Sequence, residues 1–236
     1  MKTSWRNKIL LSALIAVLAC LPLLNGTIPY GNDTAFHLNR IESLVHALYH
    51  RDLWPRVFPL QNYTFGYGSP LFYSVFFLYI PAVLRILGIP MIMTYRGFLF
   101  LIFFFSSLSI MCFLEECVTK EPLYLFLGGL LYVFCTYNFQ NIYNRGALGE
   151  ALAYIFVPVV WLGMFRLFRH RGYRSWYILA LGLSALLLSH NITFFLNVLI
   201  IIVYALVHIR DLLKDNGLLK NFVKASLMAF LITCFF

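Results

Sequence analysis

Residues 9–42 read ILLSALIAVLACLPLLNGTIPYGNDTAFHLNRIE, an apolar run that gives way within a few residues to a polar stretch. Three basic residues, Lys2, Arg6 and Lys8, precede the apolar run and predict that the N-terminus is cytoplasmic. The pattern is similar to a signal peptide, but no small-residue cleavage site follows. We therefore expect a retained first membrane helix, with the polar stretch emerging at the external surface.

The composition is that of a protein that crosses the membrane several times. The chain is 61% hydrophobic and 11% charged, with a mean hydropathy of +0.81, whereas soluble domains carry about 25% charged residues. The net charge of +9 comes from Lys and Arg in short blocks beside apolar runs, which is typical of cytoplasmic loops and not of nucleic-acid binding. The five cysteines show no CxxC spacing, so neither a metal cluster nor a disulfide framework is expected.

Eight apolar segments predict an all-α fold, a polytopic bundle of transmembrane helices in a single domain over residues 1–236. The segments are 9–24, 70–89, 91–114, 122–137, 151–165, 176–189, 192–209 and 222–236. A spanning helix needs about 20 residues, and the last segment stops short of that length. We expect the chain to be the N-terminal part of a longer protein.

The basic blocks predict which loops face the cytoplasm. Residues 166–175 and 210–224 carry the later blocks and are expected inside, whereas 25–69 forms a long first external loop. These assignments conflict if 70–89 crosses the bilayer, because the number of crossings is then odd. The favoured solution is that 70–89 is a re-entrant or interfacial segment. The alternative is that the loop 115–121, which the count of crossings places inside although it has three glutamates and only one lysine, is wrongly placed.

The same topology brings distant polar residues to one face of the membrane. It places the loop 138–149 outside. The stretch 176–209 is too long for one span, and we expect it to break at Ser189-His190-Asn191, also outside. Polar side chains from separate loops would then converge at the external surface.

Asp33, His37 and Arg40 are the leading site candidates. Their spacing of i, i+4 and i+7 places them on one face of a helix predicted from Asp33 to about Tyr49. Its apolar positions suit an amphipathic helix along the bilayer surface. A carboxylate, an imidazole and a guanidinium aligned there predict chemistry on a charged, lipid-linked substrate. The alternative for Asp33 is a helix N-cap without catalytic role.

Arg145, Glu150 and His190 are the candidates from later loops. Arg145 and Glu150 lie at the start of an apolar run and are five residues apart, too far for an ideal pair within one helix. Ionisable residues at membrane depth predict function; the alternative is that the two reach the headgroups or pair with each other. His190 lies at a helix break, where a ligand or catalytic role and a structural role are both open.

In series, these residues resemble the GT-C superfamily of membrane glycosyltransferases, and most closely its YfhO-like bacterial membrane proteins. The resemblance rests on Asp-x-x-x-His-x-x-Arg-Ile at 33–41, a glycine- and aromatic-rich element from Tyr63 to Tyr73, Arg-x-x-x-Gly-Glu-x-x-Ala at 145–153, and His190. It covers nearly the whole chain. It implies transfer of a sugar from a polyprenyl-phosphate donor at the external face of a bacterial plasma membrane.

The resemblance also implies roles for the candidates. Asp33 would be the general base on the acceptor hydroxyl or a metal ligand, and Glu150 a second ligand or an orienting carboxylate. Arg40 and Arg145 would hold the donor phosphate. The remaining candidates, His37 and His190, would contact phosphate or sugar. A divalent cation, Mg²⁺ or Mn²⁺, is implied, although the first loop lacks the adjacent acidic pair of the metal-using members.

Two other classes remain open from the sequence. A transporter or flippase of lipid-linked saccharides would also use helix breaks and charged groups, but near the middle of the membrane. A non-catalytic membrane assembly protein would need no aligned polar face. The expected partners are a lipid-linked sugar donor, membrane lipids and an acceptor of unspecified kind.

Overall fold

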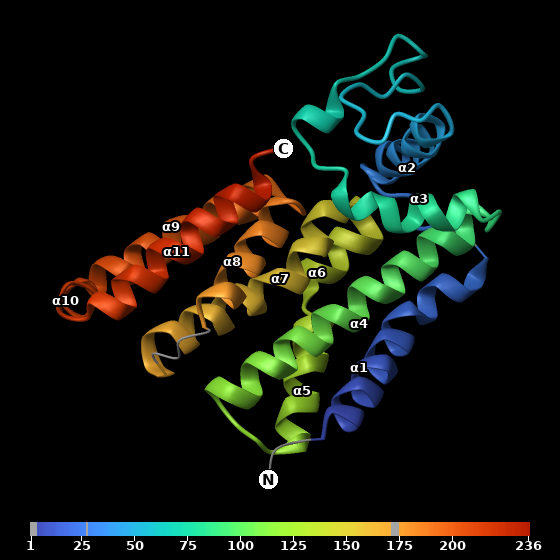
Figure 1. Cartoon of the computed structure of the whole chain (residues 1–236). Helices are drawn as coiled ribbons and strands as arrows, with labels where there is room; N and C mark the ends of the chain where they lie inside the picture. Colours follow the sequence, from blue (N-terminus) through green and yellow to red (C-terminus); the bar gives the residue numbers. More distant parts are fainter. Residues whose placement is uncertain (1–3, 27, 171–174) are drawn as a thin grey trace.

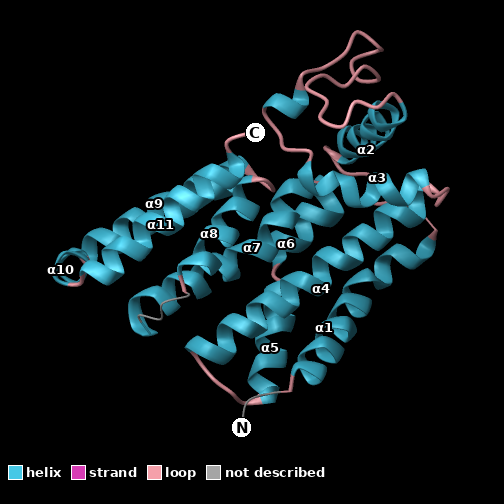
Figure 2. Cartoon of the chain, viewed as in Figure 1, coloured by secondary structure: helices cyan, strands magenta, loops and turns pink. Residues whose placement is uncertain are grey.

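The computed structural model describes residues 4–26, 28–170 and 175–236, which form helices joined by turns and loops (Figure 2). No strand forms in these residues, and Phe58 and Tyr67 pair only as an isolated antiparallel bridge. The prediction of an all-α fold is confirmed.

Among the described residues, three helices are long and apolar enough to cross a membrane. They are α1 with the 3-10 turn that extends it (Trp5–Cys20 and Leu21–Asn25), α4 (Met91–Cys117), and α7 with the π-turn that follows it (Leu148–Phe165 and Arg166–His170). The chain is an integral membrane protein, as its composition predicts.

A fourth candidate span is bent. The helix α5 (Pro122–Val133) meets α6 (Thr136–Gln140) and its π-turn (Asn141–Arg145) at 43°, and together they are apolar enough to cross. The prediction of a loop over 138–149 is therefore wrong for most of that range. Helical structure continues through this segment, where the Tyr143 hydroxyl donates to the distant carbonyl of Ala19 in α1 and the Asn138 amide donates to the carbonyl of Val133. It ends at Gly146, whose φ is +69°.

The long helices lie side by side in a row (Figure 1). Within it α1 packs on α4, α4 on α7, α7 on α8 (Trp176–Leu187), and α8 on α11 (Asn216–Thr233). The helix α9 (Asn191–Val207) contacts α7 and α8, and α10 (Ile209–Lys214) joins it to α11. Buried apolar side chains form one cluster around α1, α4 and the start of α7, and a second among the rest of α7, α8 and α11.

The apolar stretch 176–209 breaks where its polar residues predict. The helix α8 ends at Leu187, and α9 begins at Asn191 with His190 as its N-cap residue. This turn lies at the same end of the row as α2 (Thr34–Tyr49), because the Asn191 amide donates a hydrogen bond of 2.9 Å to the carbonyl of Phe72 in the loop that follows α2.

The last helix is longer than its apolar run predicts. It begins at Asn216, whereas the predicted segment covers 222–236. The reason is a helix cap: the Asp215 carboxylate accepts hydrogen bonds from the N–H groups of Gly217 and Leu218, at 2.9 and 3.1 Å.

Residues 70–89 contain no helix long enough to cross, which confirms that this stretch is not an ordinary span. Its elements are two 3-10 turns (Ser69–Leu71 and Phe76–Leu78) and α3 (Tyr79–Ile86). The helix α3 lies crosswise over the end of α4 (Figure 1). Arg85 of α3 forms an ion pair of 2.7 Å with Glu42, which joins α3 to α2.

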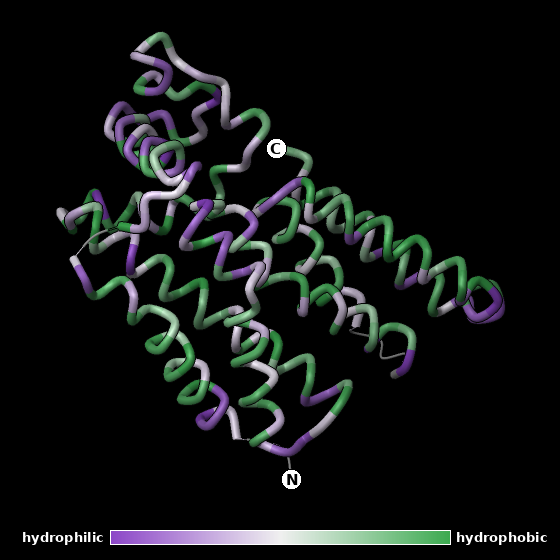
Figure 3. The backbone as a smooth tube through the Cα atoms, turned by 180° about the vertical axis from the view of Figure 1, so that it is seen from behind, coloured by the Kyte–Doolittle hydropathy of each residue, from purple (hydrophilic) through white to green (hydrophobic). Residues whose placement is uncertain are grey.

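Hydrophilic residues gather in α2 and at the ends of the long helices, whereas the middle of the row is apolar (Figure 3). At the end nearer the N-terminus, Lys8 pairs with Glu115 at 2.7 Å and Arg166 pairs with Glu116 at 2.5 Å. Both pairs join α4 to a neighbouring element. Each is close to a helix end, where water and headgroups lower the cost of a charge.

Close packing of α7 on α8 depends on small residues. A Cβ at Gly163 would lie 2.6 Å from the backbone nitrogen of Leu179, so the two helix backbones approach too closely for any side chain there. Gly182 of α8 allows the same close approach from the other helix, because a Cβ there would lie 3.0 Å from the backbone nitrogen of Val160 in α7. This is the small-residue packing that membrane helices use, because lipid gives them little hydrophobic drive to associate.

Gly163→Ala should lower the free energy of unfolding by about 1–3 kcal/mol, the usual cost of overpacking. The matched control is Gly97→Ala in α4, where no heavy atom lies within 4 Å of the position of the new methyl group. Thermal unfolding in detergent micelles would measure both variants. Equal stability of the two would contradict the close α7–α8 contact.

Candidate functional site

The helix α2 forms as predicted over Thr34–Tyr49, with Asp33 at the N-cap position. The Asp33 side chain nevertheless makes no capping hydrogen bond, so the interpretation of Asp33 as a cap is wrong. Instead the Thr34 hydroxyl accepts from the Gly31 N–H at 2.9 Å and donates to the Pro29 carbonyl, which shapes the turn before the helix. Within the part of the chain that the structure describes, the Asp33 carboxylate has no hydrogen bond or ion pair.

Backbone contacts hold the start of α2 against the turn before α7. The Asp33 N–H donates to the carbonyl of Arg145 at 2.7 Å. A Cβ at Gly31 would lie 2.5 Å from the carbonyl carbon of Arg145, and a Cβ at Gly146 would overlap the Thr34 hydroxyl. Two glycines therefore permit the contact that brings Asp33 to the Arg145 turn.

Arg145 and Glu150 form a bidentate ion pair. The Arg145 Nη2 lies 3.0 Å from Oε1 of Glu150 and its Nη1 lies 3.1 Å from Oε2, which also accepts from the Tyr137 hydroxyl at 2.6 Å. The spacing of five residues does not prevent the pair because Gly146, in the left-handed region, turns the chain between them. The Arg145 side chain remains 44% exposed, against 14% for Glu150.

Arg40 is buried, with 1% of its surface exposed. Its Nη2 donates to the carbonyls of Tyr73 and Ser74 at 2.8 and 2.9 Å, and its Nη1 lies 3.3 Å from His37 Nδ1. The structure thus brings His37 and Arg40 together on one face of α2, as their spacing predicts. The guanidinium of Arg40 fixes the loop backbone at 73–74. This role differs from the predicted one, which is to hold the donor phosphate.

His37 is buried beside this guanidinium. Burial first, and then the charges of Arg40 and His190, lower the pKa of His37 to about 3. The imidazole of His37 is therefore neutral at pH 7. It can accept a hydrogen bond from Arg40 without adding a second charge to the interior.

His190 has a structural role that the sequence left open. Its Nδ1 accepts from the Thr193 N–H at 3.3 Å and lies 2.8 Å from the Thr193 hydroxyl, so it caps α9. Its ring lies 6.0 Å from that of Tyr73, which places the cap beside the polar cluster, the group formed by Asp33, His37, Arg40, Tyr73, Arg145 and Glu150. Burial lowers the pKa of His190, and the carboxylate of Glu150 opposes this shift.

Tyr73 is the residue that sequence reasoning missed. Its ring lies 4.4 Å from the Arg40 guanidinium and 5.6 Å from the His37 ring. The glycine- and aromatic-rich element containing Tyr73 was a visible signal, but membrane-interface tyrosines give the same pattern. Only the fold places Tyr73 between α2, the start of α7 and the His190 turn.

The carboxylates of Asp33 and Glu150 do not fit a divalent cation in this arrangement. Both oxygens of Glu150 are already engaged by Arg145 and Tyr137. Among the residues that the structure describes, no group of three His, Cys, Asp or Glu side chains is placed to hold a metal ion. A resident Mg²⁺ or Mn²⁺ thus has no support in the donor set.

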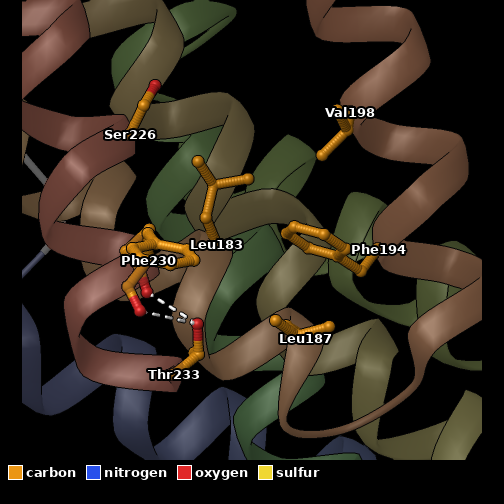
Figure 4. Close-up of a pocket in the computed structure, with 8 residues that line it drawn as sticks. Leu183, Leu187, Phe194, Val198, Ser226, Phe230 and Thr233 are labelled. Atoms are coloured by element: carbon orange, nitrogen blue, oxygen red, sulfur yellow. Dashed lines mark hydrogen bonds between the residues drawn. The ribbon is translucent and has the colours of Figure 1, made fainter. Parts of the chain in front are cut away.

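An apolar groove of about 340 Å³ lies between α8, α9 and α11 (Figure 4). Its lining residues are Leu183, Leu187, Phe194, Val198, Ser226, Ala229, Phe230 and Thr233. Leu187 and Phe194 flank the turn that carries His190, and in Figure 4 their side chains face the groove. One end of the groove is therefore adjacent to the polar cluster.

No family model and no solved structure matches the chain. An uncharacterized protein of Lactococcus lactis subsp. cremoris (strain MG1363) is 28% identical over 220 residues. The match covers 92% of this chain and 35% of that protein, so the chain spans about a third of the length of this curated relative. The relative's name carries no activity.

His37 should make the protein less stable in acid. Its pKa is about 3 in the folded state and 6.5 in the reference state, so its contribution is complete above pH 6.5 and is lost as the pH falls toward 3. The loss is at most about 1.4 kcal/mol per pH unit. We expect His37→Gln to lose less stability than the wild type between pH 6.5 and about pH 4.

His50→Gln is the control, because His50 is exposed just beyond the same helix. Unfolding free energies across this pH range would give the comparison. If His37→Gln followed the wild-type curve, His37 would not be a buried neutral imidazole.

Proposed function

We propose that this chain carries the site of a membrane glycosyltransferase that uses a polyprenyl-phosphate-linked sugar donor. One observation carries the proposal: the Asp33 carboxylate, which has no hydrogen bond among the described residues, is held by backbone contacts at the turn of Arg145, whose half-exposed guanidinium pairs with Glu150. A general base needs a free carboxylate, and a phosphate needs a reachable guanidinium. The two requirements meet at one end of the helix row.

In the proposed reaction, Asp33 accepts the proton of the acceptor hydroxyl as its oxygen bonds to the anomeric carbon. The bond between that carbon and the phosphate oxygen breaks, and polyprenyl phosphate leaves with the electron pair. Asp33 then returns its proton to water. These steps require no cation, which agrees with a donor set that does not fit one.

Arg145 is the proposed ligand of the donor phosphate, because its side chain is the more exposed of the two arginines and presents a planar fork. Glu150 would orient Arg145 in the absence of substrate. Arg40 would act at a distance, by adding positive potential below the cluster. The apolar groove beside His190 offers the lipid tail of the donor a path that stays within the bilayer.

The distribution of charge favours this proposal over a transporter. The charged residues of the candidate spans lie within the first or last two turns of their helices; they are Arg6, Lys8, Arg96, Glu115, Glu116, Arg145, Glu150, Arg166 and Arg169. A transporter of charged saccharides would need ionisable groups near the middle of the membrane. The polar cluster lies instead at one end, as in an enzyme that meets its acceptor at the surface.

We also propose an orientation. The end of the row near the N-terminus carries most of the described basic residues, so the positive-inside rule places it in the cytoplasm. The cluster would then lie on the external face. A bacterial plasma membrane is the proposed location, in keeping with the bacterial source of the similar protein.

Asp33→Asn should lower the release of polyprenyl phosphate at least about 100-fold, because the amide cannot accept the acceptor's proton. The assay uses membranes containing the protein, a panel of polyprenyl-phosphate-linked radiolabelled hexoses, and extraction of the freed lipid phosphate. The matched control is Asp52→Asn, which alters an exposed carboxylate of the same external loop. If the Asp33→Asn variant released polyprenyl phosphate as fast as the wild type, Asp33 would not be the general base.

The orientation can be tested with two single cysteines in a cysteine-free background. The two variants are Leu87→Cys and Val118→Cys. Leu87 follows α3, Val118 follows α4, and their side chains are similarly exposed, at 72% and 70%. A membrane-impermeant maleimide added to intact cells should label Cys at 87 and not at 118. The reverse pattern would place the cluster in the cytoplasm.

A further inference from the structure

Tyr73 is held in one orientation by groups from two parts of the chain, α2 and the α8–α9 turn. The guanidinium of Arg40 lies 4.4 Å from its ring, and the rings of His37 and His190 lie at 5.6 and 6.0 Å. Arg40 also binds the Tyr73 carbonyl. Since both backbone and ring are fixed, the phenol oxygen cannot move far.

The phenol oxygen is placed against the start of α7. The backbone N–H of Gly149 donates to it, and a Cβ at Gly149 would overlap it. Gly149 is the second residue of α7, so its N–H is among those left without an intrahelical partner. This contact uses the phenol oxygen as an acceptor and leaves its proton free.

Burial and three charged groups act on the Tyr73 hydroxyl. Burial is the main cause that raises the pKa of Tyr73 to about 12; Arg40 opposes the rise, and the carboxylates of Glu150 and Asp33 add to it. Tyr73 therefore stays a hydrogen-bond donor at pH 7. Among the described residues no acceptor takes this proton.

The surrounding charges indicate what the hydroxyl binds. Glu150 is paired with Arg145, whereas among the described residues no cation pairs with Asp33, so an anion would bind on the Arg145 side and a neutral acceptor hydroxyl on the Asp33 side. A phenol donor held at Gly149, the residue before the Glu150 that pairs with Arg145, suits a phosphate oxygen. A sugar hydroxyl would gain less, because hydrogen bonds to charged groups are stronger.

We infer that the Tyr73 hydroxyl donates a hydrogen bond to the phosphate of the lipid-linked substrate and so forms, with Arg145, the phosphate subsite. The inference rests on the proposed function for the identity of the lipid. It assigns to Tyr73 direct contact with the substrate and to Gly149 the positioning of the phenol oxygen.

The test compares Tyr73→Phe with the wild type in binding a polyprenyl phosphate and the matching uncharged polyprenol, in detergent, by a direct titration. Tyr73→Phe removes only the hydroxyl and keeps the ring on Arg40. We expect it to weaken binding of the phosphate about tenfold or more and to leave polyprenol binding unchanged.

Tyr67→Phe is the matched control. Tyr67 lies in the same loop, and its ring is 6.4 Å from that of Phe36, the same distance as the ring of Tyr73. Half of Tyr67 is exposed, and its hydroxyl is not fixed by Gly149. Tyr67→Phe should bind both lipids as the wild type does, and melting temperatures would confirm that both variants are folded.

Three outcomes would overturn the inference: wild-type binding of the phosphate by Tyr73→Phe, an equal loss for phosphate and polyprenol, or no binding of polyprenyl phosphate by the wild type. The transferase assay separates this from the proposed function. Tyr73-dependent phosphate binding without sugar transfer would refute the function and keep the subsite. Sugar transfer that is insensitive to Tyr73→Phe would support the proposed function and refute the phosphate subsite.

Discussion

The guanidinium of Arg40 is the interaction on which the polar end of the structure depends. It is buried, and in the described part of the chain it has no carboxylate partner. A charge in such a place is costly unless its donors are satisfied. One of its terminal nitrogens, Nη2, donates to the carbonyls of Tyr73 and Ser74. These two hydrogen bonds fix the position of the loop that follows α2.

Fixing this loop has consequences along the chain. The loop leads into α3, which lies across the end of α4 and cannot itself cross the membrane. The stretch 70–89 thus connects two points at the same end of the helix row, and the long helices on either side can alternate in direction. The bond from Asn191 to the carbonyl of Phe72 then ties the α8–α9 turn to the same loop. A single buried cation accordingly helps to set both the topology and the position of His190.

The sequence predicts the features that depend on local periodicity. The helix α2, the shared face of His37 and Arg40, and the break near His190 all follow from spacing and polarity over a few residues. Local spacing and polarity do not predict the continuation of the helix through 136–145 or the role of Tyr73. Both depend on partners distant in sequence, such as Gly149 for the phenol oxygen. The pairing of Arg145 with Glu150 needed a left-handed Gly146 that no periodicity reveals.

The contrast between the two carboxylates is the strongest structural argument for chemistry at this end. Glu150 is held by Arg145 and Tyr137, so its charge is compensated before any substrate arrives. Asp33 is brought to the same turn by its backbone, yet its carboxylate is left without a described partner. Asp33 occupies the N-cap position of α2, where a capping carboxylate contributes about 1 kcal/mol, yet its side chain makes no capping hydrogen bond. A free carboxylate beside a compensated one is the division of roles that a base and an anion site require.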